Sequence, residues 1–140
     1  MLSQRKWHPP NRENAGATFE IRPRQLIGQP GGPGIASGGA RVIRQHADLA
    51  DFKYGEVLVC DAVDPNMTFV VPLASAVVER RGGMLIHGAI IARELGIPCV
   101  NGIEDLLGWL SDDDAVTVDG HLGIVTVGPP DFGLEGVTIT

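Results

Sequence analysis

An alternation of short β-branched runs with segments of helical pattern constrains the fold of this 140-residue chain more than any other feature. Short runs rich in valine and isoleucine are typical of buried strands. They predict strands at residues 40–44, 56–60, 75–79, 98–100, 115–119 and 122–127, with helices starting at Asp64-Pro65 and spanning residues 88–95 and 103–110. Strands and helices in this order favour an α/β domain with a mixed sheet.

Local turn and capping residues support these bounds. Asp64 can cap the free amides of a helix whose first residue is Pro65. Gly96 suits the C-terminal end of the helix before it, and Asp119-Gly120 is a typical hairpin turn. The glycine-rich stretch from Gly28 to Gly39 is expected to be a turn that precedes the first strand.

The length of the chain fits one domain. Residues 1–24 are polar and contain three prolines, so we expect a flexible N-terminal arm or linker remnant there. The compact domain is expected to span residues 25–128. Residues 129–140, which begin with two prolines, are expected to form a loose tail or an edge strand.

Composition excludes several classes of partner and site. A net charge of -6 disfavours binding to nucleic acid or to an anionic membrane surface. Cys60 and Cys99 lie in apolar runs and are expected to be buried free thiols. The run Asp112-Asp113-Asp114 is expected to be a solvated turn rather than a metal site. We find no signal peptide at the N-terminus and no apolar stretch of membrane-spanning length, so we expect a cytoplasmic protein.

The segment from Val77 to Gly102 is the part of the sequence with the clearest chemical potential. Gly82 and Gly83 allow the backbone to turn sharply and to approach a ligand closely. A helix then begins near His87, where the first amides have no partner within the helix and the helix dipole favours negative charge. A phosphate group near His87 would therefore meet free N–H donors.

Histidine can form a covalent bond to phosphorus because its neutral imidazole is nucleophilic near neutral pH. One ring nitrogen would need an acceptor to fix the tautomer, and the sequence does not identify that acceptor. Gly88 and Ala89 are expected to leave room for a bulky donor beside His87. From these residues alone, a capping or packing role for His87 remains an alternative.

The same segment resembles the phosphohistidine signature of the phosphoenolpyruvate-utilising enzyme family, T-D-x-G-G-x-x-S-H-A-A-I-x-A-R-E-x-G-I-P-x-V. Matches in register occur at Gly82-Gly83, His87, residues 89–94 and residues 96–100. Further resemblance lies at residues 34–42, 55–59, 64–65, 116–120, Gly123 and Val125, so that about 100 of the 140 residues are covered.

The resemblance implies a swivelling β/β/α domain that carries phosphate on His87 between two active sites in partner domains. We expect Arg81, Gly82, Gly83 and Gly88 to bind the phosphate. The resemblance also implies that nucleotide-binding or phosphoenolpyruvate-binding partner subunits hold ATP, magnesium or phosphoenolpyruvate. This chain would then need no cofactor or metal of its own. The chain would then be a stand-alone phosphohistidine carrier domain or subunit of a phosphotransferase and not a complete enzyme alone.

Several positions depart from the family pattern. Leu85 and Ile86 stand where hydroxyl-bearing residues are usual, and Glu79-Arg80 replaces the usual Thr-Asp. These changes favour the alternative of a non-catalytic interaction or regulatory module with the same fold. A small subunit of an aconitase-like hydro-lyase and a metal site formed by His46, His87 and His121 are weaker alternatives.

Overall fold

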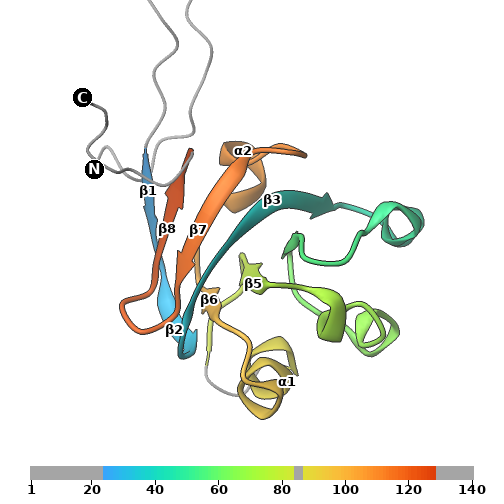
Figure 1. Ribbon diagram of the computed structural model, residues 1–140, viewed down its shortest axis with the longest axis horizontal. Coiled ribbons are helices and arrows are strands. Elements are labelled where there is room, and N and C mark those ends of the chain that lie inside the picture. The colour runs from blue at the N-terminus through green and yellow to red at the C-terminus, as the bar shows by residue number, and fades with distance from the viewer. Residues whose placement is uncertain (1–23, 84–86, 129–140) are drawn as a thin grey trace, which may run out of the picture.

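The computed structural model describes residues 24–83 and 87–128 (Figure 1). Its strands are β1 (Gln25–Ile27), β2 (Gln29–Gly32), β3 (Ile35–Ile43), β4 (Val57–Cys60), β5 (Ala76–Glu79), β6 (Cys99–Asn101), β7 (Ala115–Asp119) and β8 (Ile124–Val127). The α-helices are α1 (His87–Leu95) and α2 (Leu106–Trp109), and short 3₁₀ helices occupy His46–Asp51, Pro65–Met67 and Val71–Leu73.

The strands form one mixed sheet in the order β1-β8-β7-β3-β4-β5-β6-β2. Strands β3, β4, β5 and β6 run parallel to one another, while the pairs β1–β8, β7–β8, β3–β7 and β2–β6 are antiparallel. Strands β1 and β2 form the two ends of this order, yet only Gly28 separates them in the chain. The sheet therefore curls until its two edges meet at Gly28, and the expected α/β class with a mixed sheet is confirmed.

Each face of the parallel strands packs against its own apolar cluster. Along β5, Ala76 and Val78 belong to the cluster enclosed by the curled sheet, whereas Val77 belongs to the cluster beneath α1 and the 3₁₀ helices. This alternation follows from the two-residue period of a strand, and burial on both faces explains the continuous apolar runs in the sequence. Figure 1 shows α1 outside the curled sheet, next to β5 and β6. The helix α1 thus covers the outer face of the strands that lead to the candidate site.

The prediction of a turn from Gly28 to Gly39 is wrong, because most of this stretch lies in β2 and in the first half of β3. These strands contain glycine because atoms of neighbouring segments approach them closely. A Cβ atom added to Gly38 would lie 2.6 Å from the carbonyl oxygen of Gly55, and one added to Gly31 would lie 3.0 Å from Sγ of Cys99. The glycines therefore permit tight strand packing here rather than a reversal of the chain.

Other predicted elements lie close to their observed positions, with one shortened helix. Helix α2 begins only at Leu106, because Ile103 is buried and its amide bonds to the carbonyl of Glu79 at 3.4 Å. Asp64 caps the 3₁₀ helix after it through the amide of Asn66 at 2.8 Å, and Gly96 has the expected positive φ of 72°. The capping residues therefore predicted the start of this 3₁₀ helix and the end of α1 correctly.

The two cysteines are free and buried, as expected. The predicted arm at residues 1–24, apart from Arg24, and the predicted tail at residues 129–140 lie outside the described residues. Over the ranges that the structure describes, no helix has the length and apolar character needed to cross a membrane.

Candidate functional site

The carboxyl ends of β4, β5 and β6 meet at one edge of the sheet, where ligands commonly bind in α/β folds. The backbone continues its pairing beyond the strands: the amide of Arg80 bonds to Cys60 O at 3.0 Å, and the amide of Arg81 bonds to Asp61 O at 3.0 Å. The amide of Gly102 in turn bonds to Arg81 O at 2.9 Å. The predicted glycine loop therefore starts from a rigid edge, with Asp61 and Gly102 on either side.

Two side chains that the sequence analysis did not identify hold this loop. Gln29 accepts a hydrogen bond from the amide of Gly83 at 3.0 Å, and Asn101 donates its Nδ2 hydrogen to Gly83 O at 3.3 Å. A Cβ atom on Gly82 would lie 2.8 Å from Oε1 of Gln29, and Gly83 has a φ of 114°. The backbone conformation therefore requires a glycine at position 83, whereas a side chain at position 82 would displace the carboxamide of Gln29. The isolated Asn101 in an apolar run was the available signal for this contact.

His87 is the first residue of α1, and its side chain is exposed. The structure therefore agrees with the expectation of an accessible histidine at a helix N-terminus. Because the first amides of any α-helix have no partner within the helix, the start of α1 offers donors and a favourable field to an anion. Leu85 and Ile86, the residues that depart from the family pattern before the histidine, lie outside the described residues.

Asp61 pairs with both arginines that follow β5. It contacts Nε of Arg80 and Nε of Arg81, the latter at 2.9 Å. The hydrogen bond from Arg80, followed by the charges of both arginines, lowers the pKa of the Asp61 carboxyl group. Arg81 is 62% exposed, and within the described ranges its terminal amino groups form no further ion pair. Arg81 is therefore oriented by Asp61 and keeps donors that face solvent.

A buried carboxyl group lies beneath the start of α1. Glu79, the last residue of β5, is fully buried, and its Oε2 accepts a hydrogen bond from the amide of Val63 at 2.7 Å. A Cβ atom on Gly88 would lie 2.7 Å from Cδ and 2.8 Å from Oε1 of Glu79. The space that Gly88 leaves is thus filled by Glu79 and does not serve a bulky donor, contrary to the expectation from sequence. Burial raises the pKa of Glu79 to about 7.

The two cysteines lie on the same side of the sheet as Glu79, within the cluster beneath α1. Burial raises the pKa of Cys60 well above its ordinary value and that of Cys99 to about 12. Because a thiolate is the reactive form of cysteine, these groups are packing residues and not nucleophiles.

The two other described histidines, His46 and His121, do not join His87 in a metal site. Nε2 of His121 accepts a hydrogen bond from the amide of Gly34 at 3.1 Å, which fixes the turn before β3. His46 lies at the start of a 3₁₀ helix. Among the described residues, no group of three or more His, Cys, Asp or Glu side chains is arranged to hold a metal ion.

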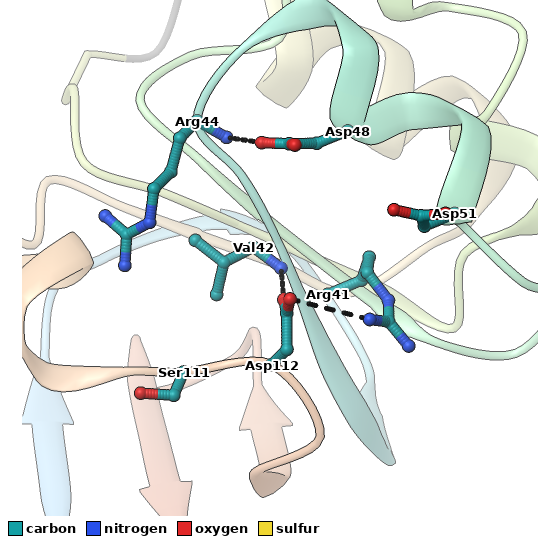
Figure 2. A pocket seen from close by; sticks show the side chains of 7 residues that line it. All are labelled: Arg41, Val42, Arg44, Asp48, Asp51, Ser111 and Asp112. Atoms are coloured by element: carbon teal, nitrogen blue, oxygen red, sulfur yellow. Dashed lines mark hydrogen bonds and ion pairs between the residues drawn. The ribbon is translucent and has the colours of Figure 1, made fainter.

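A polar pocket near the end of β3 has a structural role, which Figure 2 illustrates. Asp112 accepts a hydrogen bond from the amide of Val42 at 2.7 Å, and its carboxylate lies 3.5 Å from Nη1 of Arg41. Arg41 also forms a two-point contact with Glu56, at 3.1 and 2.7 Å. The run Asp112-Asp113-Asp114 is therefore not only a solvated turn, because it also binds residues of β3.

Residues 52–123 match the family model described as the mobile domain of PEP-utilising enzymes. A probable phosphoenolpyruvate synthase from Methanothermobacter thermautotrophicus is 35% identical over 111 residues, which cover 78% of this chain but only 16% of that protein.

Solved structures give the same assignment of the fold. The solution structure of Enzyme I has a TM-score of 0.51 and 32% identity, and the match covers 59% of this chain and 34% of that chain. Aconitase X from Thermococcus kodakaraensis has a TM-score of 0.59 over 75% of this chain and 98% of that chain. Its identity of 19% supports a shared fold alone.

Proposed function

The chain belongs to the mobile-domain family of phosphoenolpyruvate-utilising enzymes, and from that premise we propose that it carries a phosphoryl group on His87. The observation that supports this proposal most directly is the exposed imidazole at the first residue of α1. It follows a loop of two glycines that starts from the carboxyl edge of the parallel strands. A carrier needs a reactive group that partners can reach, and this position provides one.

The proposed transfer forms a bond between an imidazole nitrogen of His87 and phosphorus. The P–O bond to the donor breaks, and its electron pair leaves with the donor oxygen. The phosphoryl oxygens would accept hydrogen bonds from the amides of Gly82 and Gly88 and from the guanidinium group of Arg81. Asp61 supports this role because it binds Nε of Arg81 and so orients the guanidinium group. The amide of Gly83, which the sequence analysis also expected to bind phosphate, instead donates to Gln29.

We propose a carrier domain or subunit that exchanges phosphate with partners, and not a complete enzyme. The chain spans 16% of the length of the phosphoenolpyruvate synthase relative, which leaves most of that protein without a counterpart here. A nucleotide-binding partner, a phosphoenolpyruvate-binding partner or both would supply ATP, magnesium and phosphoenolpyruvate. The mobile domain itself would contribute the histidine and its anion-binding surroundings.

The second candidate is an interaction or regulatory module that retains the fold without phosphotransfer. The substitutions at Leu85 and Ile86 favour it, because they remove polar groups next to the histidine.

Incubation with a cognate donor enzyme tests the proposal. Mass spectrometry should find one added phosphoryl group on His87, and the adduct should be labile in acid and stable in base, as expected of a phosphoramidate. His87→Ala should abolish the label and leave the fold intact, because the side chain is exposed.

The matched control is His46→Ala, which removes another exposed histidine away from α1 and should leave labelling unchanged. Label on a different histidine would contradict the site. No label with nucleotide-dependent or phosphoenolpyruvate-dependent donors would favour the non-catalytic module.

A further inference from the structure

The carboxyl group of Glu79 is placed to respond to charge at the start of α1. It is fully buried and lies against Gly88, the residue that follows His87. Its Oε2 accepts the amide hydrogen of Val63, whereas Oε1 has no hydrogen-bond partner in the described residues. A buried polar atom without a partner is costly in a folded protein, so this oxygen requires a functional or chemical explanation.

Glu79 forms no ion pair among the described residues. On β4 its neighbours are the buried thiol of Cys60 and, just beyond the strand, the carboxylate of Asp61. On β6 they are the thiol of Cys99 and, one residue beyond the paired positions, the amide of Asn101. Arg80 and Arg81 follow in sequence, but their described ion pairs are with Asp61. Arg93 of α1 donates to the carbonyl oxygen of Gly31, and its charge acts on the adjacent Cys99. An ionised Glu79 would therefore be a buried charge without a described ion-pair partner.

From this geometry we propose that Glu79 is a positioning residue for His87 that takes up a proton when a phosphoryl group is attached and releases it when that group leaves. This inference rests on the proposed function. Phosphorylation adds close to two negative charges beside the helix start. Since Gly88 separates that start from Glu79 without a side chain between them, protonation of Oε1 is the direct way to relieve the repulsion.

The balance of the step is simple. The N–P bond forms on His87 while the bond between phosphorus and the donor's leaving atom breaks, and the electron pair of that bond stays with the leaving atom, which is oxygen in a biological donor and nitrogen in phosphoramidate. One proton moves from solvent to Oε1 of Glu79. Transfer to an acceptor reverses both changes. The proton acceptor is effective because burial already brings the pKa of Glu79 to about 7, where a modest added field changes its ionisation at neutral pH.

The test uses the full chain labelled with ¹³C at the glutamate carboxyl carbons, and the inorganic donor phosphoramidate to phosphorylate histidine. NMR titration before and after phosphorylation measures the pKa of Glu79, whose resonance is the one absent from Glu79→Gln. We expect the pKa to rise by about one pH unit or more, the scale of shift that a nearby like charge produces. An unchanged pKa on a chain phosphorylated at His87 would overturn the inference while leaving the proposed function intact. A chain whose His87 accepts no phosphoryl group would overturn both.

A kinetic measurement separates coupling from a merely structural role. The rate of phosphorylation by phosphoramidate is compared between wild type and Glu79→Gln from pH 5.5 to pH 8.5, and the ratio of the two rates is followed as a function of pH. The variant should become several-fold faster than wild type at the upper end of this range. Glu94→Gln, which removes an exposed carboxylate from the same helix, should give a ratio independent of pH. A flat ratio for Glu79→Gln would refute the coupling.

Discussion

Replacing Glu79 with Gln should make the protein more stable at alkaline pH and leave its stability in acid nearly unchanged. Glutamine has almost the same shape and can keep the acceptor for the amide of Val63, but it cannot ionise. The wild-type carboxyl group has a pKa of about 7 in the folded chain, raised by burial from its ordinary value of 4.5.

The magnitude and its sign follow from proton linkage. Below pH 4.5 both the folded and the unfolded chain hold the proton, so the carboxyl group causes no pH-dependent loss of stability. Between pH 4.5 and about 7 the unfolded chain releases its proton while the folded chain retains it, and stability falls as pH rises. The difference of about 2.5 pH units, at about 1.36 kcal/mol each, corresponds to a loss of about 3 kcal/mol above pH 7.

Urea unfolding of both proteins at a series of pH values, followed by circular dichroism and by the fluorescence of the buried Trp109, measures this effect. The free energy of unfolding of Glu79→Gln minus that of wild type should rise by about 3 kcal/mol between pH 4 and pH 8. Glu94→Gln serves as the exposed control and should show little change. A difference for Glu79→Gln that is constant over this range would refute the reasoning.

Three further predictions concern the packing of α1, the arginine and the glycine loop. Gly88→Ala should destabilise the fold by about 1–3 kcal/mol through its clash with Glu79, and adding Glu79→Thr should recover most of that loss in a double-mutant cycle measured by urea unfolding. Arg81→Ala should weaken inorganic phosphate binding several-fold by NMR titration, whereas Arg44→Ala, which removes an arginine outside the site, should not. Gln29→Ala should speed amide hydrogen exchange at Gly83 with only a small change in global stability, and unchanged exchange would contradict the role of Gln29 in holding the loop.

The sequence carried enough information to predict the α/β class, most strand positions and the location of His87 at a helix start. These features depend on local patterns: apolar runs that form buried strands, a proline and an aspartate that start a turn, and a glycine that ends α1. The order of the family motifs added the swivelling fold. Each of these features depends on residues that are close together in the sequence, so a local pattern is sufficient to predict its position.

Tertiary structure decided the features that depend on contacts between distant segments. Strand β2 and the first half of β3 are rich in glycine and lack an apolar alternation, and they become strands only because β6 and β7 offer backbone partners. Gln29 meets Gly83 across 54 positions of sequence, so no local pattern could reveal that contact. Glu79 follows an apolar run like any residue at the end of a strand, and only the packing of α1 over β5 buries its carboxyl group against Gly88. A local pattern specifies the conformation of a segment, whereas the solvent exposure and charge state of a side chain depend on which distant segments cover it.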